Sequence, residues 1–408
     1  MNPDWQPHRK AALEQLQAFL PHAGQDYSRS RNHDFGPERR GNVSTLSPWV
    51  RHRLVLEQEL VAGARALHGD DKAEKFIQEV FWRTYWKGWL ELRPAVWHDY
   101  LAELGDHEQA LDDRPELRKQ LERAVRGETG IDCFDAWTRE LCSTGYLHNH
   151  ARMWFASIWI FTLELPWTLG ADFFLRNLLD GDPASNTLSW RWVAGRQTPG
   201  KTYLARASNI SKFTDRRFIP EPGQLAPEAQ APASIPPHPE ITPLLPPESA
   251  DSALRTGLLL TEEDLYPESL PDLPPIAAVA ASHWASCRSS APVADHVLQF
   301  TRSAQADALA RAADHWHCET TGLVASADAR AILTWGAAHG IEQLVIPWIP
   351  TGPARDRIDL LQPELEAAGL RVCRPRREWD SASWPHARAG FFRFRKAIPR
   401  LMDELLNT

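Results

Sequence analysis

Two short stretches of the sequence combine acidic, amide and aromatic side chains in a way that suits the binding of a flat polar ring. In DGDPASNTLSWRW, residues 180–192, two acids flank a glycine, and an asparagine and two tryptophans follow. In QEVFWRTYWKGW, residues 78–89, Glu79, Trp82 and Arg83 are spaced i, i+3 and i+4, so they share one face of a helix. Carboxylates and amides can hydrogen-bond to a polar ring, and indoles can stack on it. Taken singly, the first stretch could also be a surface turn and the second a salt-bridged helix face.

A third stretch, GNVSTLSPWV, has the residue types of a phosphate-binding loop. Ser47 followed by Pro48 predicts a helix start, with serine as the N-cap and proline at the first helical position. Ser44, Thr45 and Ser47 would then lie beside free backbone amides at the positive end of a helix, which suits a pyrophosphate. Any capped helix has this pattern, so the stretch gains meaning only beside the other two.

Composition sets the wider limits. The 408 residues exceed the usual single domain of roughly 100 to 200, so we expect two domains. The 18 tryptophans are far more than usual, which indicates a use for indole beyond packing. The five cysteines form no CxxC pair, so we expect free thiols and no metal site. The sequence has neither a long apolar run nor the apolar core of a signal peptide, which predicts a cytoplasmic protein without a membrane partner.

Hydrophobic periodicity predicts two structural halves. Residues 1–218 read as helical almost throughout, with breaks at the glycine of STG and before Arg93-Pro94. Residues 276–408 read as a small doubly wound α/β domain. Its expected strands are 276–284, 342–350 and 371–377, and its expected helices are 327–341 and 356–370.

Charge and proline are unevenly distributed between these halves. From Phe218 to Pro275 there are ten acids against one base, and 14 of the chain's 32 prolines. We therefore expect residues 219–275 to be an extended linker that joins neither a sheet nor a long helix. From Arg191 to Arg217, seven bases face one acid, which predicts a basic surface despite the net charge of −8.

Two segments, GADFFLRNLLDGDPASNTLSWRWVAG and STGYLHNHARMWFAS, resemble the flavin-binding core of the DNA photolyase and cryptochrome family. The resemblance extends over roughly residues 27–218. It implies a multidomain α and α/β protein, with a helical FAD-binding domain at 1–218 and an antenna-like domain at 276–408. The family usually has the opposite domain order. The implied cofactor is FAD, with reduced FADH⁻ as the active form, and the antenna chromophore is left unknown.

The resemblance also implies roles for individual residues around the flavin. Asp182 would accept a hydrogen bond from the flavin or its ribitol, Asp180 would pair with Arg152 at the ring edge, and Asn186 would face the flavin N5. Val43 stands where the family usually has a hydroxyl residue, which removes one expected phosphate contact. The other implied flavin contacts are Tyr27, Ser44, Thr45, Leu46, Ser47, Phe76, Glu79, Arg83, Tyr146 and Asn149.

A substrate cavity and an electron-transfer chain are implied as well. Glu79 would bind the pyrimidine carbonyls and Trp82 would stack on the damaged base. The flavin would receive electrons from Trp190 next to it and Trp167 behind that, with the outer member open among three candidates. Further substrate contacts would be Met153, Trp192 and Arg206, and the outer candidates are Trp97, Trp86 and Trp159.

Together these residues imply light-driven repair of cyclobutane pyrimidine dimers, the reaction of deoxyribodipyrimidine photolyase, which is a carbon–carbon lyase. The partner would be DNA containing pyrimidine dimers, bound by a monomer that flips the lesion out of the duplex. Two alternatives stay open. One is a cryptochrome-like blue-light photoreceptor, and the other is a light-independent flavoprotein with a vestigial DNA pocket.

Overall fold

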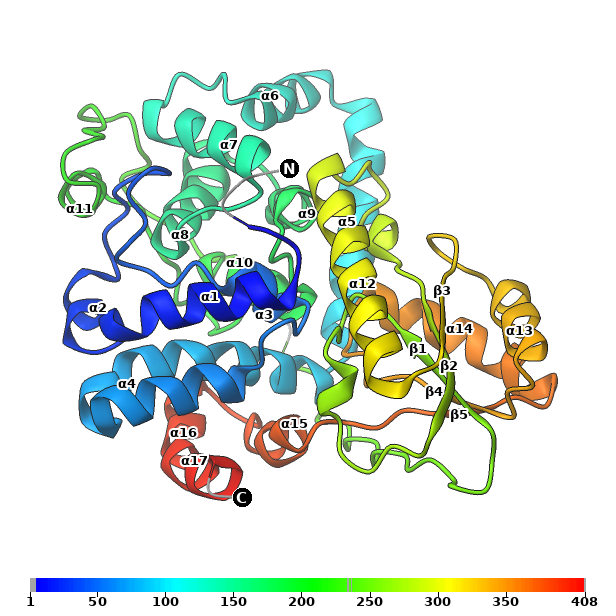
Figure 1. The fold of residues 1–408 in the computed structure, drawn as a ribbon. Coiled ribbons are helices and arrows are strands. Elements are labelled where there is room, and N and C mark those ends of the chain that lie inside the picture. The colour runs from blue at the N-terminus through cyan, green and yellow to red at the C-terminus, as the bar shows by residue number, and fades with distance from the viewer. Residues whose placement is uncertain (1–4, 233–234, 236, 407–408) are drawn as a thin grey trace.

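The computed structural model describes residues 5–232, 235 and 237–406 of the chain. Figure 1 shows a helical body with a small parallel sheet beside it. In the described part of residues 1–218 all regular elements are helical, as predicted. They include α1 (Arg9–Phe19), α2 (Gln25–Ser30), α3 (Ser47–Arg51), α4 (Glu57–Glu91), α5 (Ala95–Asp113), α6 (Pro115–Arg126), α7 (Asp132–Thr144), α8 (Asn149–Ser157), α9 (Trp167–Asn177), α10 (Pro183–Val193) and α11 (Ala207–Phe213).

Glycines mark two of the helix boundaries that position the site. Gly145 ends α7 in the left-handed conformation, with φ of 71°, so the break predicted at STG is confirmed. Gly69, also with φ of 71°, interrupts the backbone of α4. The half of α4 after Gly69 carries Glu79 and Arg83 on one face.

The sheet has five parallel strands in the order β3-β2-β1-β4-β5, with crossovers that make it doubly wound. Three of the strands, β2, β4 and β5, lie where the sequence predicted them. Strand β3 was not predicted, because its four residues contain no apolar run. Helix α12 was not predicted either, although its alanines favour a helix. The elements are β1 (Thr256–Leu260), β2 (Ile276–Ala281), β3 (Glu319–Gly322), β4 (Gln343–Val345) and β5 (Arg371–Cys373), with α12 (Asp295–Trp316), α13 (Ala329–Ala338) and α14 (Pro353–Ala367).

The prediction that residues 219–275 cannot join a sheet is wrong for its C-terminal part. Strand β1 lies inside this range and forms the centre of the sheet, paired with β2 on one side and β4 on the other. The segment TGLLL is apolar and free of proline, but acids and prolines on both sides dominate the composition of the whole range. The described residues between 219 and 255 form neither helix nor strand.

The two faces of the sheet pack against different partners. Leu259 and Leu344 face a local core with α13 and α14. Leu258 and Val345 point to the other face and belong to the same hydrophobic core as the helical body. The helical body and the sheet therefore share buried apolar surface, which holds them together more firmly than a flexible tether would.

The C-terminal residues return to the helical body instead of staying beside the sheet. Helices α15 (Glu378–Ser383), α16 (Phe391–Phe394) and α17 (Ile398–Leu406) lie against α4 (Figure 1). Trp379 stacks on Phe81 with ring centroids 4.8 Å apart, and its indole donates to the Thr84 hydroxyl at 3.0 Å. Within the described residues, no helix has the length and apolar character needed to cross a membrane.

Candidate functional site

A cavity of about 450 Å³ opens between α2, α4, α8 and the loops that precede α3 and α10. This volume is within the usual range for small-molecule sites. We call it the central cavity. It is lined by Tyr27, Arg31, Asn32, Val43, Ser44, Thr45, Ser47, Glu79, Arg83, Tyr146, Leu147, Asn149, His150, Arg152, Met153, Asp180 and Ser185.

Most of the residues predicted to contact the flavin line this cavity, and four do not. Leu46 and Phe76 are buried in the hydrophobic core, and Phe76 packs edge-on against the Tyr27 ring at 5.4 Å. Asp182 and Asn186 are buried immediately behind the wall that Ser185 forms. These four residues therefore support the cavity wall.

Three guanidinium groups give the central cavity a cationic character. Arg152 pairs with Asp180 at 2.8 Å, so the ion pair expected from the sequence is present. Arg31, which the sequence reasoning missed, pairs with Glu79. Burial raises the pKa of Glu79, and the Arg31 cation opposes that shift. Arg83, the third guanidinium, lies on α4 one turn after Glu79.

Asp182 anchors the loop between α9 and α10. Its Oδ1 accepts a hydrogen bond from the Ser185 amide at 2.8 Å, which makes Asp182 the N-cap of α10. Its Oδ2 lies 3.4 Å from the Arg83 guanidinium and 3.6 Å from the Lys87 ammonium. Burial alone would raise the pKa of Asp182, but the nearby cations outweigh it and hold that pKa below its usual range.

Lys87 was not predicted to belong to the site. It is 2% exposed, and burial lowers the pKa of its ammonium group. Neither Lys87 Nζ nor Asp182 Oδ2 has a hydrogen-bond partner within the described part of the chain. Nothing in its local sequence separates Lys87 from an ordinary surface lysine, so only the fold shows that it faces Asp182.

The predicted phosphate-binding loop differs from the sequence expectation in its helix start. Leu46 occupies the N-cap position and Ser47 is the first helical residue, so the predicted serine cap is wrong. Helix α3 has only five residues, and an anion here would depend on the side-chain hydroxyls more than on a helix dipole. Thr45 has φ of 53°, which is strained for a β-branched residue. The Trp5 indole and the Gln15 amide hold this backbone by donating to the carbonyls of Thr45 and Ser44.

Helix α10 brings Asn186 and Trp190 to the protein interior. The side-chain amide of Asn186 donates to the Ala171 carbonyl at 2.7 Å, which fixes its orientation. The Trp190 ring makes edge-to-face contacts with Phe174 at 5.1 Å and with Trp159 at 6.2 Å.

The tryptophan that contacts Trp190 is therefore Trp159, one of the candidates for the outer position. Trp167, expected in the middle, packs on Tyr100 at 5.6 Å and donates to Glu103. Trp97 is reached through the same Tyr100 ring, at 5.4 Å. No ring contact joins Trp190 to Trp167 among the described residues.

The two tryptophans expected to stack on a base do not line the central cavity. Trp82 stacks on Phe391 of α16 with ring centroids 3.7 Å apart and an interplanar angle of 12°, so one ring face is covered. Trp192 packs on Tyr203 at 5.5 Å, and the Tyr203 hydroxyl lies 3.3 Å from Nε2 of His150. Because His150 lines the cavity, Trp192 lies beyond its rim. Met153 and Glu79 remain as the cavity residues expected to contact substrate.

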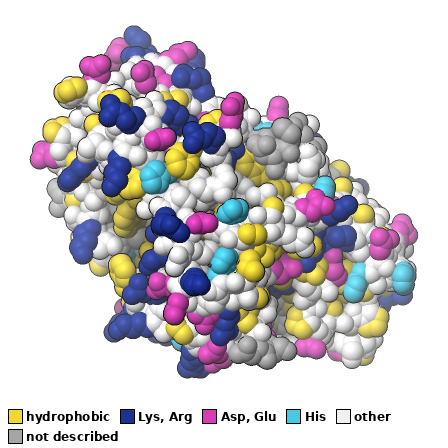
Figure 2. All heavy atoms as spheres, turned by 60° about the vertical axis from the view of Figure 1, so that its left-hand side comes forward, with side chains coloured by type: hydrophobic (Ala, Val, Ile, Leu, Met, Phe, Trp, Pro, Cys, Tyr) yellow, Lys and Arg dark blue, Asp and Glu magenta, His cyan; other side chains and the backbone are white. Residues whose placement is uncertain are grey.

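The basic run from Arg191 to Arg217 is only partly free to bind an anion. Arg196 pairs with Glu103 at 3.1 Å and Arg217 pairs with Asp34 at 2.6 Å. Figure 2 shows Lys and Arg side chains gathered on the left part of the helical body in that view. From this run, the bases that are exposed and make no ion pair within the described part are Lys201, Arg206, Lys212 and Arg216.

His148, the N-cap of α8, should make stability depend on pH. Burial lowers the pKa of His148 to about 4, against about 6.5 when unfolded. As the pH falls from 7 to 5, His148 therefore takes up a proton in the unfolded chain but stays neutral in the folded chain. This difference lowers the free energy of unfolding by about 2 kcal/mol. His148→Asn keeps an N-cap acceptor and removes the titration, so its stability should fall less over this interval. Urea unfolding at both pH values measures the difference, and equal losses in the two proteins would refute the assignment.

The residues of the central cavity fit a flavin dinucleotide. Arg31, Arg83 and Arg152 can neutralise a diphosphate, and the loop hydroxyls can donate to it. Tyr146 offers an aromatic face, and Asp180 offers a carboxylate. Behind the wall, Asp182 Oδ2 and the Lys87 ammonium form an ion pair at 3.6 Å but make no hydrogen bond among the described residues, so both keep hydrogen-bonding capacity for a bound polar ring.

Comparison with known proteins agrees with this geometry. Residues 76–220 match the family described as FAD binding domain of DNA photolyase. The deoxyribodipyrimidine photo-lyase of Streptomyces griseus is 38% identical over 192 residues, which is 44% of this chain and 39% of that protein. The corresponding protein of Escherichia coli (strain K12) is 31% identical over 204 residues, or 48% of this chain and 41% of the relative. The chain thus spans less than half the length of these relatives.

Solved structures of similar proteins include a cryptochrome and a photolyase. The Synechocystis sp. PCC6803 cryptochrome is 24% identical with a TM-score of 0.42, covering 52% of this chain and 44% of that one. The class III photolyase from Agrobacterium tumefaciens is 23% identical with a TM-score of 0.39, covering 55% and 50%.

Proposed function

We propose that this chain, whose residues 76–220 match the FAD binding domain of DNA photolyase, is a member of the DNA photolyase and cryptochrome family and a flavoprotein that uses blue light to split cyclobutane pyrimidine dimers in DNA. The observation that carries this proposal is the composition of the central cavity. It combines three guanidiniums suited to a dinucleotide with Glu79 and Met153, which suit a pyrimidine. One cavity can then hold both the cofactor and the damaged base.

The chain's own residues hold and orient the cofactor in this proposal. Arg152, Asp180 and Arg83 surround the ring, and the loop hydroxyls of Ser44 and Thr45 bind the phosphates. Bound and reduced, FAD supplies the electron that light transfers to the dimer. The buried residues behind the wall, including Asn186 and Trp190, keep water out of this region.

Glu79 is suited to bind the pyrimidine pair. Its raised pKa keeps the carboxyl protonated to higher pH than an exposed glutamic acid. A protonated carboxyl can donate a hydrogen bond to a pyrimidine carbonyl oxygen. The Arg31 guanidinium fixes its orientation, and Met153 supplies adaptable apolar contact beside it.

The proposed substrate is duplex DNA with the dimer flipped into the cavity. A dimer is already poorly stacked, so it costs less to extrude than an intact pyrimidine pair. The exposed bases Lys201, Arg206, Lys212 and Arg216 contribute phosphate contacts that do not depend on damage and weaken as salt rises. We propose that the protein acts in the cytoplasm as a monomer.

Binding to DNA with and without a thymine dimer separates these two contributions. Trp192→Ala is expected to lower the preference for damaged DNA by about 1 kcal/mol, roughly fivefold, because an indole beside the cavity rim is lost. Arg206→Ala should weaken both DNAs equally, because it removes a phosphate contact. Fluorescence anisotropy with the two duplexes at fixed salt measures both effects. A wild-type protein that binds both duplexes equally would contradict dimer recognition.

A blue-light photoreceptor is the second candidate, and one contact favours it. Phe391 covers one face of Trp82, so the C-terminal helices occupy a surface that a stacked base would otherwise use. In a photoreceptor, a redox change at the flavin would alter a partner surface instead of a lesion. Persistence of the Trp82–Phe391 contact in a complex with damaged DNA, together with absence of repair, would support this alternative.

A further inference from the structure

We propose that Glu263 and Asp264, two of the three consecutive acids that follow strand β1, are positioning residues for the flavin-binding site, although neither lines the central cavity. The inference rests on the proposed function only in taking FAD as the ligand. Both acids belong to the part of the chain that carries the sheet, and both reach into the helical body through buried arginines. The sheet would thereby set the geometry of the cofactor site.

The first connection runs from Glu263 through Arg51 to the loop before α10. Both terminal nitrogens of Arg51 donate to the Glu263 carboxylate, at 2.7 and 2.6 Å. The remaining Nε donates to the carbonyl of Gly181 at 2.8 Å. Arg51 is 1% exposed and Glu263 is 4% exposed, so water does not compete for these bonds. The bidentate pair holds the Arg51 guanidinium in one orientation. Its Nε–H in turn holds the carbonyl of Gly181, the residue between Asp180 and Asp182.

The second connection runs from Asp264 to the cavity wall through charges of alternating sign. Arg53 lies 3.3 Å from Asp264 and 3.9 Å from Glu57. Glu57 accepts from Nε of Arg83 at 3.2 Å, and the other end of Arg83 lies 3.4 Å from Asp182. Arg83 itself lines the cavity. The adjacent acids Glu263 and Asp264 therefore reach the same loop by two separate routes.

The arginines around Glu263 and Asp264 favour the ionised form of both carboxylates. Burial alone would raise the pKa of Glu263 and of Asp264, but Arg51 outweighs it at the first and Arg377 at the second, so both pKa values are lowered. Arg377 makes two hydrogen bonds to Asp264, at 2.7 and 2.8 Å. Ionic contacts are stronger in the buried interior than at the surface, so removal of one charge is felt by the next.

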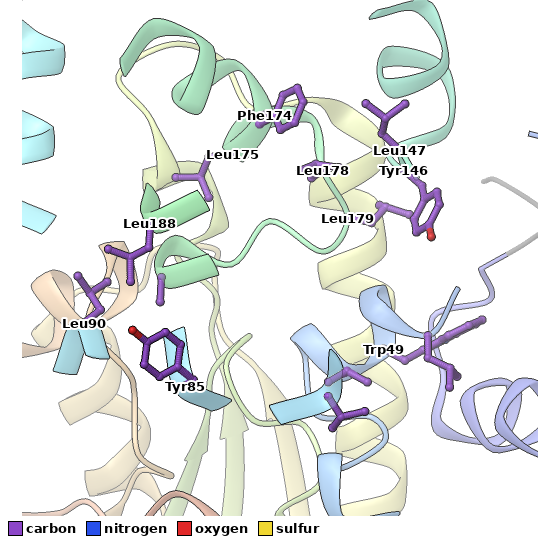
Figure 3. Close-up of a cluster of buried hydrophobic side chains, with 14 of the residues drawn as sticks. Trp49, Tyr85, Leu90, Tyr146, Leu147, Phe174, Leu175, Leu178, Leu179 and Leu188 are labelled. Atoms are coloured by element: carbon purple, nitrogen blue, oxygen red, sulfur yellow. The ribbon is translucent and has the colours of Figure 1, made fainter. Parts of the chain in front are cut away.

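The loop before α10 is also held at its other end. The Ala294 amide donates to the backbone carbonyl of Arg176 at 3.1 Å, and Nε2 of His296 lies 2.7 Å from the Asn177 carbonyl. Figure 3 shows Leu179 beside Tyr146, and the Leu179 amide donates to the Gly145 carbonyl at 2.9 Å. The segment that carries Asp180 and Asp182 is thus fixed between the helical body and the part of the chain that carries the sheet.

Glu262 offers a matched control within the same three-residue run. It is 2% exposed and as buried as its neighbours, but among the described residues its carboxylate accepts only from the Trp284 amide, at 2.9 and 3.2 Å. It forms no ion pair with the helical body within the described part of the chain. Glu262→Gln therefore replaces a neighbouring buried carboxyl by an amide without breaking an ion pair that leads to the loop before α10.

The test compares FAD dissociation constants of the full-length wild type and the Glu263→Gln, Asp264→Asn and Glu262→Gln variants. Release of FAD on serial dilution, followed by flavin fluorescence, gives the constants. We expect Glu263→Gln and Asp264→Asn to bind FAD about tenfold more weakly than Glu262→Gln, as the loss of one charge-assisted hydrogen bond would cause. The thermal midpoint of the FAD-free protein should be lower for Glu263→Gln than for Glu262→Gln, because only Glu263→Gln leaves the buried Arg51 guanidinium without its carboxylate partner, so the FAD dissociation constants are measured well below both midpoints.

A double substitution distinguishes positioning from a general loss of structure. Arg51→Gln should weaken FAD binding, and adding Glu263→Gln to it should weaken binding little further, because both act through one contact. If Glu263→Gln does not fold, Glu263→Asp retains the charge but shortens the reach and is measured in its place. Equal FAD affinities for the Glu262 and Glu263 variants, with the wild type binding FAD, overturn the positioning role alone. A wild-type protein that binds no FAD overturns both this inference and the proposed function.

Discussion

The Arg152→Ala variant is expected to bind FAD roughly 100-fold more weakly than the wild type, because truncating one partner of a buried charge pair leaves the other unpaired. The carboxylate left behind belongs to Asp180, whose side chain is 5% exposed, and it would repel the anionic cofactor. The same arginine also donates to the Leu147 carbonyl at 2.8 Å, so its loss loosens the start of α8. Titration of the protein with FAD, followed by flavin fluorescence, measures the change.

Arg206→Ala is the matched control for this experiment. Arg206 precedes α11, is exposed and lies outside the central cavity. Its removal should leave the affinity for FAD unchanged. An Arg152→Ala variant that binds FAD as tightly as Arg206→Ala would show that the flavin does not occupy the central cavity.

Replacing Trp190 with phenylalanine is expected to reduce the rate of flavin photoreduction to a small fraction of the wild-type rate while FAD stays bound. An excited flavin can oxidise a nearby indole, and phenylalanine is a much poorer electron donor. Trp190 is buried and does not line the cavity, so the substitution should change the electron supply more than the binding site. Absorbance at the oxidised flavin band under blue light, with a thiol present, gives the rate.

The ring contacts of Trp190 and Trp167 predict which second tryptophan takes part in electron transfer. Because Trp159 contacts Trp190 and Trp167 packs on Tyr100 instead, Trp159→Phe should slow photoreduction more than Trp167→Phe. If Trp167→Phe slows photoreduction more than Trp159→Phe, the electron-transfer chain expected from the sequence, Trp190 followed by Trp167, would be supported instead. Unchanged photoreduction in Trp190→Phe would remove this tryptophan from electron transfer altogether.

The helical body could be predicted well because its signals are local. Helical periodicity and the glycine of STG each act within a few residues, and the structure places α7 and α8 accordingly. Strand β1 was missed because its three leucines lie in a range dominated by acids and prolines. Charge counted over a long window cannot distinguish solvated acids from acids such as Glu263 that pair with buried arginines.

The candidate site could be predicted where its residues share one helix or one loop. Arg83 and Glu79 are adjacent on α4, and the Asp180–Arg152 pair follows from the resemblance. The position of Lys87 behind the cavity and the covering of Trp82 by Phe391 depend on contacts between distant segments. Such contacts are set by tertiary packing, which a single sequence does not reveal.

The most direct test of the proposed function is illumination of the reduced protein with DNA that contains thymine dimers. Under blue light, the wild type should restore absorbance at the thymine band, because splitting the cyclobutane ring regenerates the pyrimidines. Glu79→Ala should slow this recovery by about 2- to 10-fold, as expected for the loss of one hydrogen bond to the substrate, and photoreduction of its flavin should be unaffected. If fully reduced wild-type protein leaves the dimers unsplit after prolonged illumination, the protein is not a repair enzyme and the photoreceptor alternative replaces it.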